Sequence, residues 1–248
     1  IAAGDNTNPH ASDGFGPINE TEKGLGSDAQ RTAGNSNDLR GGIMRIIINE
    51  DGSYDIPAGN LYPQGTVNTR PETYIKGCRN PFRIFVDKKT DFVHWGEVGP
   101  DGQKDGDRGP RGHDEYNIAT QAGYFGWPYH VGVAYYTDYN FETKVLGKSF
   151  AEGIINDSPR NTGLSELPPV TPATIWYPYA ASEIFPEMGT GGRNAMAGPV
   201  IYQEGLTHNF PAFFDGKPMF YDWVRGHIKM VTLNENNQCV GLEPFLDS

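Results

Sequence analysis

Glycine and proline interrupt this sequence so often that long helices are excluded. The 248 residues include 32 glycines and 19 prolines, and both residue types are poorly tolerated inside a helix. The 13 tyrosines, 13 phenylalanines and 4 tryptophans suit the pleated, half-buried surface of a sheet. No stretch shows a convincing helical period. The sequence therefore predicts an all-β protein with many short strands and well-defined turns.

Apolar or alternating segments that end at turn residues predict about nine strands. Two pairs of segments are predicted to form hairpins, Phe82–Asp87 with Phe92–Val98 and Met219–Trp223 with His227–Leu233. The second hairpin turns through Val224-Arg225-Gly226. The other predicted strands are Ile43–Ile48, Asp114–Ala119, Thr174–Tyr177, Pro199–Tyr202 and Val240–Leu246.

Polar, glycine-bearing segments separate the predicted strands. We expect loops over residues 5–40, 55–71 and 99–113, and a long insertion rich in tyrosine and proline over 132–172. A loop as long as the insertion is usually functional or forms a lid. Propeller blades have four strands and span about 40–45 residues. Nine or ten strands would therefore make only two to four blades, fewer than a closed ring needs.

The chain opens on Ile1-Ala2-Ala3-Gly4-Asp5, which is typical of a strand that ends in a turn. We therefore expect this chain to be part of a longer protein. No signal peptide is recognisable. No apolar run reaches the roughly 18 residues that would span a bilayer.

The acidic balance and the cysteine pattern limit the classes of partner. A net charge of −11 repels the phosphate backbone and disfavours nucleic acid. The many aspartates are also consistent with calcium binding, although an acidic surface that only keeps the protein soluble is the simpler explanation of the net charge. The two cysteines, Cys78 and Cys239, have neither metal-ligand nor haem-attachment spacing. A disulfide between them cannot be deduced from the sequence.

Several short motifs occur in a fixed order along the chain. Gly4-Asp5-Asn6 comes first, followed by Gly77–Arg83 (G-C-R-N-P-F-R) and Gly96–Pro100 (G-E-V-G-P). Asp114–Ile118 (D-E-Y-N-I), Gly123–Pro128 (G-Y-F-G-W-P) and Phe220–Val231, which contains Arg225-Gly226, complete the series. Together they resemble the PQQ-dependent glucose/sorbosone dehydrogenase family. The long loops around Leu167-Pro168-Pro169 and Gly191–Pro199 are similar to those of a large multi-domain bacterial branch.

The resemblance implies a six-bladed β-propeller of the soluble quinoprotein glucose dehydrogenase type. Residues 1–248 would form one propeller domain, an incomplete C-terminal portion that lacks the N-terminal blades and carries long loops. The implied function is oxidation of a sugar or sugar derivative with PQQ and Ca²⁺. The implied location is periplasmic or extracellular, with cytochrome c or another electron acceptor as a partner. The alternative is a non-catalytic propeller that binds carbohydrate or a protein.

PQQ is an anionic tricyclic quinone, so its site needs cations, a divalent metal and flat apolar walls. By resemblance, Arg79 and Asn80 would contact the quinone oxygens, where a cation stabilises the charge that appears on reduction. The alternative is a structural arginine packed near Trp95 or Phe82. Arg193 and Arg225 would bind the carboxylates of the cofactor, since arginine can do so bidentately.

Calcium ligands are expected in two places. By resemblance, the backbone carbonyls of Gly99 and Pro100 would bind Ca²⁺, which prefers hard oxygen ligands; an ordinary turn is the alternative. Asp114 and Glu115, with the aspartates of the 99–113 loop, could bind a second ion. Their spacing does not match an EF-hand, and a solvated acidic loop is favoured there.

Aromatic residues could form the walls of the site. Trp127, Tyr124 and Trp223 could line the sugar or the cofactor, and for any single one a core position is the safer prediction.

The catalytic base is not recognisable. In the family a histidine just before the first motif takes the proton of the sugar hydroxyl, and a base must lie within hydrogen-bond reach of that proton. None of the six histidines, His10, His94, His113, His130, His208 and His227, lies in that motif. Val98 and Val224 replace polar residues of the soluble glucose enzymes, so glucose specificity is not implied. A hydrolase using Glu97 and Asp114 as paired carboxylates is a third alternative.

Overall fold

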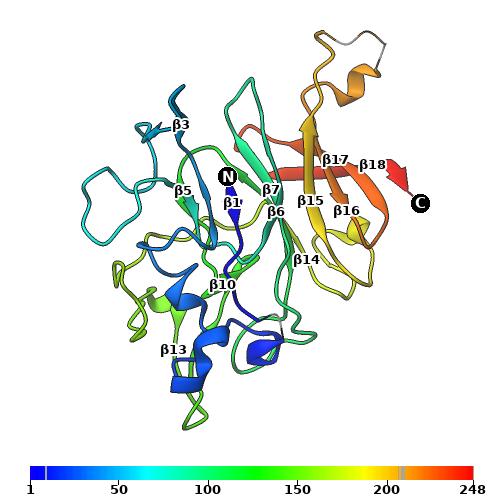
Figure 1. Ribbon diagram of the computed structural model, residues 1–248. Coiled ribbons are helices and arrows are strands. Elements are labelled where there is room, and N and C mark those ends of the chain that lie inside the picture. The colour runs from blue at the N-terminus through cyan, green and yellow to red at the C-terminus, as the bar shows by residue number, and fades with distance from the viewer. Residues whose placement is uncertain (9, 206, 208–209, 248) are drawn as a thin grey trace. The chain divides into compact units, whose positions relative to one another are not determined.

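The computed structural model describes residues 1–8, 10–205, 207 and 210–247 (Figure 1). Over these residues the chain forms eighteen strands, β1 to β18, and no α-helix. The all-β prediction is confirmed, although the strands are twice as many as predicted because several have only two residues. Six short 3-10 helices interrupt the loops: Ala11–Gly14 (η1), Glu22–Ser27 (η2), Ala29–Arg31 (η3), Phe150–Glu152 (η4), Pro186–Met188 (η5) and Ala212–Phe214 (η6).

The chain divides into two compact units, each assembled from three separate stretches of sequence. Unit 1 consists of Ile1–Pro81, Gly99–His113 and Gln121–Pro172. Unit 2 consists of Phe82–Val98, Asp114–Thr120 and Ala173–Ser248. The single propeller domain over residues 1–248 stays a prediction.

Unit 1 contains a four-stranded sheet with the order β1-β2-β5-β9. These strands are Ala2–Ala3, Gly42–Met44, Thr73–Lys76 and Gly123–Tyr124. The first three pair in antiparallel fashion, and β9 is parallel to β5. The opening residues therefore do form a strand before the turn at Gly4.

The predicted strand Ile43–Ile48 is divided in the structure. Its first part is β2, whereas Ile47–Ile48 (β3) pairs with Tyr54–Asp55 (β4) in a separate hairpin. The break occurs at Arg45, whose backbone N–H donates to the carbonyl of Glu72 at 2.9 Å. The side chain of Arg45 also bonds to the 55–71 connection, so the chain leaves the first sheet there.

The insertion over residues 132–172 is folded and does not form a structureless loop. It takes part in two hairpins, His130–Val131 (β10) with Ala134–Tyr135 (β11), and Thr137–Asn140 (β12) with Val145–Ser149 (β13). The core of unit 1 includes Trp127 of the G-W-P motif, the neighbouring Tyr129, and the insertion residues Tyr136, Phe150, Ile154 and Leu167. Large apolar side chains at irregular spacing gave no strand signal in the sequence.

Unit 2 contains two antiparallel four-stranded sheets. The first has the order β14-β8-β7-β6, with strands Ile175–Tyr177, Asp114–Ala119, Val93–Glu97 and Pro81–Val86. The second has the order β15-β16-β17-β18, with strands Ala195–Val200, Pro218–Asp222, His227–Leu233 and Cys239–Asp247. Both predicted hairpins are confirmed. A four-stranded antiparallel sheet is the repeating unit of a propeller blade.

Strand β15 begins four residues before the predicted strand Pro199–Tyr202. Three of its first four residues, Ala195, Ala197 and Gly198, are small and carry little strand signal. The neighbouring strand β7 requires a glycine at position 96, because a Cβ atom there would lie only 2.1 Å from the carbonyl oxygen of Ala195. Close approach of β15 to β7 therefore selects residues whose strand preference is weak.

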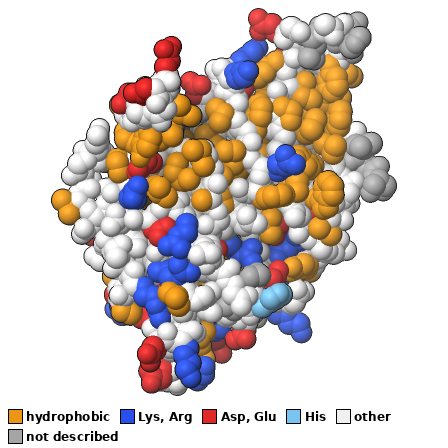
Figure 2. Space-filling view, viewed as in Figure 1, with side chains coloured by type: hydrophobic (Ala, Val, Ile, Leu, Met, Phe, Trp, Pro, Cys, Tyr) orange, Lys and Arg blue, Asp and Glu red, His pale blue; other side chains and the backbone are white. Residues whose placement is uncertain are grey.

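The core of unit 2 lies where these two sheets pack. Tyr116, Tyr177 and Phe220 are fully buried, and the ring centroids of Tyr116 and Tyr177 lie 5.1 and 6.0 Å from that of Phe220. Figure 2 shows hydrophobic side chains gathered over the β15–β18 sheet. Cys78 is buried and Cys239 is partly buried, and no disulfide joins these two described residues. No helix in the part of the chain that the structure describes is long and apolar enough to cross a membrane.

Candidate functional site

Arg79 and Asn80 follow directly after β5 in unit 1, and the strand positions their backbone. The carbonyl of Arg79 accepts a hydrogen bond from the N–H of Asp5 at 2.8 Å. Gly4 lies close beside it, since a Cβ atom there would approach that carbonyl to 3.3 Å and Asn80 Oδ1 to 3.7 Å. The first two motifs of the sequence are therefore in contact. The Arg79 side chain is half-buried and Asn80 is exposed, so both are accessible to a ligand.

Trp127 belongs to the same neighbourhood but lies in the core of unit 1. Its indole Nε1 donates to Asp5 Oδ2 at 2.6 Å, and its backbone N–H donates to Gly77 at 3.0 Å. Only 4% of the residue is exposed. Trp127 therefore lies in the core, the position that the sequence favoured for any single aromatic residue of this set. A role for Trp127 in lining the cofactor site stays a prediction. Trp223, in contrast, is 73% exposed at the end of β16.

Gly99 and Pro100 are buried at the start of the 99–113 loop in unit 1. The loop folds back on itself, because Gly112 donates to the carbonyl of Gly102, which in turn donates to Gly14. A Cβ atom on Gly112 would lie 1.7 Å from the Pro100 oxygen, so the backbone passes directly over that carbonyl. The loop is an ordered structure around the predicted carbonyl ligands.

Asp114 and Glu115 begin β8 in unit 2 and their side chains point to opposite faces of the sheet. Asp114 is fully buried, accepts from the N–H of Ala195 at 3.0 Å and pairs with Arg193 at 3.5 Å. Glu115 accepts from Asn117 Nδ2 at 2.9 Å. The structure therefore does not bring the two side chains of this predicted metal pair together.

The register of β7 and β8 places Glu97 directly opposite Glu115, and not beside Asp114. Trp95 Nε1 donates to Glu97 Oε2 at 3.1 Å. Both carboxylates are buried, and Asn117 Oδ1 accepts no hydrogen bond from any described residue. The hydrolase alternative with Glu97 and Asp114 is thus wrong in its pairing. The sheet instead offers two carboxylates and an amide oxygen on one face, all of them hard ligands that suit calcium.

Arg193 and Arg225 are both engaged within unit 2. Arg193 is 7% exposed and stacks on Tyr179 with its Cζ 3.9 Å from the ring centroid. Arg225 stacks on Tyr177 at 4.7 Å. Its guanidinium also donates to five backbone carbonyls, those of Pro178, Met188, Gly189, Gly191 and Gly192. Both arginines therefore have structural partners, and their binding of cofactor carboxylates stays a prediction.

His94 in β7 and His130 in β10 are buried, and burial keeps both imidazoles neutral near pH 7. Burial lowers the pKa of His94 to about 4, and likewise lowers the pKa of His130 to about 4. His94 Nδ1 lies 2.8 Å from the hydroxyl of Tyr116 in the core of unit 2. His208 lies outside the described residues. A buried neutral imidazole in a core has no access to substrate, so neither His94 nor His130 is a candidate base.

Sequence analysis missed two charged groups near the motifs. Lys76, one residue before Gly77, is 1% exposed, and its Nζ donates to the carbonyls of Asp38 and Arg40 at 2.6 and 2.7 Å. Asp222 accepts from the hydroxyl of Tyr177 at 2.6 Å and from the N–H groups of Val224 and Arg225. Only contacts between segments far apart in sequence identify these roles.

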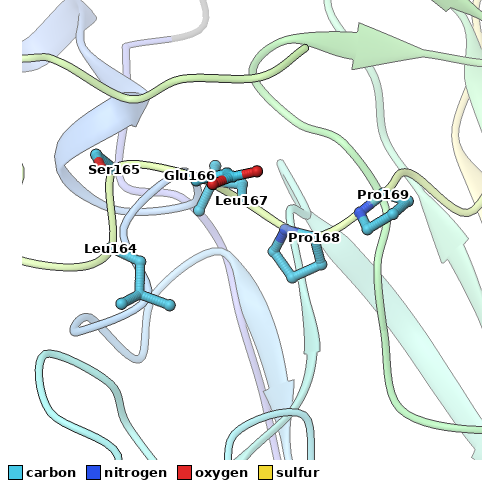
Figure 3. Close-up of a pocket in the computed structure, with 6 residues that line it drawn as sticks. All are labelled: Leu164, Ser165, Glu166, Leu167, Pro168 and Pro169. Carbon is cyan, nitrogen blue, oxygen red and sulfur yellow. The ribbon is translucent and has the colours of Figure 1, made fainter.

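The pocket drawn in Figure 3 lies in the insertion of unit 1 and has a volume of about 520 Å³. Its lining residues, Leu164 to Pro169, follow one another along one segment, with the Glu166 carboxylate directed away from the Leu164 side chain (Figure 3). The lining is mostly apolar and its charged group is a carboxylate. It therefore lacks the cations that an anionic quinone requires.

No described cluster of three or more histidine, cysteine, aspartate or glutamate side chains could hold a metal ion by itself. Calcium in this chain would need backbone carbonyls or amide oxygens in addition, as at Gly99, Pro100 and Asn117. The ordered motifs, the buried carboxylate pair and the four-stranded antiparallel sheets define an all-β protein with a polar cluster on one sheet.

Comparison with known proteins identifies the family. Residues 21–156, more than half of the chain, match the model of the glucose/sorbosone dehydrogenase family. The chain belongs to this family. A curated relative, the HIPL2 protein of Arabidopsis thaliana, is 29% identical over 128 residues, which is 46% of this chain and 17% of that protein.

Solved structures of sugar dehydrogenases show a weaker likeness. The apo aldose sugar dehydrogenase of Escherichia coli is 16% identical with a TM-score of 0.49, over 86% of this chain and 47% of that one. The PQQ-bound aldose sugar dehydrogenase of Streptomyces coelicolor is 15% identical with a TM-score of 0.45, over 94% and 48%. The chain thus spans about half the length of these enzymes. TM-scores below 0.5 do not define a common fold, so the all-β architecture rests on the sheets themselves.

Proposed function

We propose that this protein oxidises a sugar or sugar derivative, using PQQ and calcium. The observation that carries the proposal is the family match over residues 21–156, which includes most of the motif residues. Arg79, Asn80, Gly99, Pro100 and Trp127 all lie within that stretch and within unit 1. Their common unit supports a shared site, and the family supports the type of reaction.

Arg79 and Asn80 supply the polar contacts for the quinone in this proposal. When bound, PQQ accepts the hydride that leaves the sugar carbon. The Arg79 guanidinium and the Asn80 amide would donate hydrogen bonds to the quinone oxygens, and these donors would stabilise negative charge there. Their exposure fits a ligand that enters from solvent. Arg79 is held through its backbone by Asp5, so its position does not depend on the ligand.

Calcium has suitable oxygen ligands in the chain. The carbonyls of Gly99 and Pro100 are the proposed ligands on the 99–113 loop of unit 1. Glu97, Glu115 and Asn117 Oδ1 offer a second set on β7 and β8 of unit 2, and the unsatisfied Asn117 oxygen supports a cation there.

The base that takes the sugar proton is proposed to be a histidine that precedes Ile1 in the longer protein. We further propose cytochrome c or another carrier as electron acceptor, and a periplasmic or extracellular location.

The test is oxidation by the full-length protein reconstituted with PQQ and CaCl₂, followed by dye reduction with a panel of aldoses. Arg79→Gln should lower kcat by roughly 100-fold, since one lost donor to a developing charge has that effect. The matched control is Arg83→Gln, because Arg83 is an exposed arginine four residues further on. Sugar binding without PQQ-dependent dye reduction would instead establish a non-catalytic binding propeller.

A further inference from the structure

A polar pocket of unit 1 is used by none of the proposed chemistry. It has a volume of about 550 Å³ and is lined by Tyr54, Asp55, Ile56, Gln64, Pro71 and Glu72. The volume lies within the range of small-molecule sites, about 300–1,000 Å³. The pocket lies between the β3–β4 hairpin, whose first strand is labelled β3 in Figure 1, and the connection that follows it.

The connection that forms one wall is fixed to the main sheet of unit 1. Arg45 Nε donates to Asn60 Oδ1 at 2.9 Å, and Asn60 Nδ2 donates to the carbonyls of Arg45 and Pro71 at 2.9 and 2.8 Å. The Arg45 guanidinium also stacks on Tyr74, with its Cζ 4.6 Å from the ring centroid. The wall is therefore set by contacts outside the pocket and does not need a ligand to form.

Glu72 fixes the aromatic side of the pocket. Its side chain is 9% exposed, and Arg70 binds both carboxylate oxygens, Nη2 to Oε1 at 3.0 Å and Nε to Oε2 at 3.3 Å. The hydroxyl of Tyr54 donates to Glu72 Oε1 at 2.9 Å, yet half of Tyr54 remains exposed. This arrangement holds an aromatic ring in a set orientation with its surface open to solvent.

Two lining side chains have hydrogen-bonding capacity that the described protein does not use. Asp55 Oδ2 accepts a long hydrogen bond from Asn49 Nδ2 at 3.3 Å, while Oδ1 has no partner among the described residues. The Gln64 amide has no hydrogen bond within the described chain either, and it can both donate and accept. The pocket thus presents one acceptor, one amide and one aromatic surface.

The lining determines the chemical class of ligand. The carboxylates of Asp55 and Glu72 repel phosphates and other anions, and the Arg70 cation is already paired with Glu72. A purely apolar ligand would leave the Asp55 and Gln64 groups desolvated without partners. A neutral polyhydroxyl ring satisfies both demands, because its hydroxyls donate and accept while its C–H face packs on an aromatic ring.

We propose that this pocket is a binding site for a neutral sugar unit. Tyr54 packs on the face of the sugar ring, and Asp55 and Gln64 bind its hydroxyls. The site goes beyond the proposed oxidation, since neither PQQ nor calcium takes part and none of its residues belongs to the family motifs named above. It would hold a carbohydrate on the protein independently of turnover.

The experiment measures sugar binding by the full-length protein without PQQ, using saturation-transfer NMR and calorimetry. The probes are cellotetraose and maltotetraose, with glucosamine, CaCl₂ and inorganic phosphate as comparisons. We expect a neutral oligosaccharide to bind. Tyr54→Ala and Asp55→Asn should each raise its Kd about tenfold or more, the effect of losing roughly 1.4 kcal/mol. Glu50→Gln, a matched charge removal on the same hairpin but outside the pocket, should leave the Kd unchanged.

Gln64→Ala is a pocket variant that should fold like the wild type, because this exposed side chain makes no hydrogen bond within the described protein. It too should weaken sugar binding while leaving the melting temperature as in the wild type. Absence of neutral sugar binding at millimolar concentration would overturn the proposal, as would binding that all three pocket variants retain. Binding of glucosamine or Ca²⁺ without binding of a neutral oligosaccharide would also overturn the proposal. Loss of binding in Arg79→Gln would place the sugar at the proposed quinone site and not here.

Discussion

Asp5 joins its own segment of unit 1 to two others, through its carboxylate and its backbone N–H. It accepts from Trp127 Nε1 at 2.6 Å and from Thr7 at 3.0 and 2.7 Å, while the Asp5 N–H holds the carbonyl of Arg79. Gly-Asp-Asn in the sequence is only a turn signal. Its role in positioning Arg79 comes from the tertiary structure, since Arg79 and Trp127 are more than seventy residues away.

Asp5→Asn is expected to destabilise the protein by about 1.5–3 kcal/mol, the usual value for a hydrogen bond to a charged group. The reason is that Asp5 is 5% exposed and solvent cannot replace its partners. Urea unfolding followed by tryptophan fluorescence measures the change. Asp51→Asn, which alters an exposed aspartate in the β3–β4 turn, is the control. Equal stability of Asp5→Asn and wild type would contradict the structural role of Asp5.

Lys76 makes stability depend on pH. Burial lowers the pKa of its ammonium group from 10.5 to about 7, against the opposing effect of the Asp38 carboxylate. Between these two values the unfolded chain keeps a proton that the folded chain has released. The free energy of unfolding should therefore rise with pH across this window, by at most about 1.36 kcal/mol per pH unit.

Urea unfolding between pH 7 and pH 10 measures this slope. Lys76→Met should remove its contribution, whereas Lys104→Met, at an exposed position, should leave it. A Lys76 contribution of opposite sign would mean that the carbonyls of Asp38 and Arg40 hold the charged form.

The turn between β16 and β17 makes contacts with residues outside the hairpin. The sequence predicted this hairpin correctly, because Asp222 and Gly226 bound two alternating apolar segments. It predicted cofactor binding for Arg225, whereas the structure places five carbonyls around that guanidinium. Residue type alone does not distinguish an arginine that binds a ligand from one that closes a loop.

Arg225→Lys should lower stability by roughly 2 kcal/mol, because a lysine cannot reach several carbonyls in the fork geometry of a guanidinium. Limited proteolysis should also become faster in the Gly189–Gly192 segment that Arg225 holds. Thermal unfolding and mass analysis of the fragments measure both effects. Arg83→Lys, at an exposed position, is the matched control. Unchanged proteolysis would show that the loop does not depend on Arg225.

The buried carboxylate pair, Glu97 and Glu115, would link calcium binding to the stability of the whole protein. If calcium binds Glu97 and Glu115, chelation with EGTA should lower the melting temperature of the full-length protein by about 5 °C. The Glu97→Gln/Glu115→Gln double variant should show a smaller shift, since the carboxylate charge that attracts the ion to this site is gone and only the proposed Gly99–Pro100 site remains. The exposed Glu152→Gln is the control, and calorimetry with and without EGTA measures the effect. A shift as large in the double variant as in the wild type would show that Glu97 and Glu115 bind no calcium.

The sequence by itself determined the class of protein. Frequent glycine and proline exclude long helices, alternating segments specify strands and hairpins, and the ordered motifs identify the family, because all of these are encoded over short distances. The tertiary structure decided which motif residues have partners in the protein. Strand register brought Glu97 opposite Glu115 and separated it from Asp114, and burial placed Trp127 in the core. These outcomes depend on contacts between distant segments, and the spacing of residues along a chain does not specify such contacts.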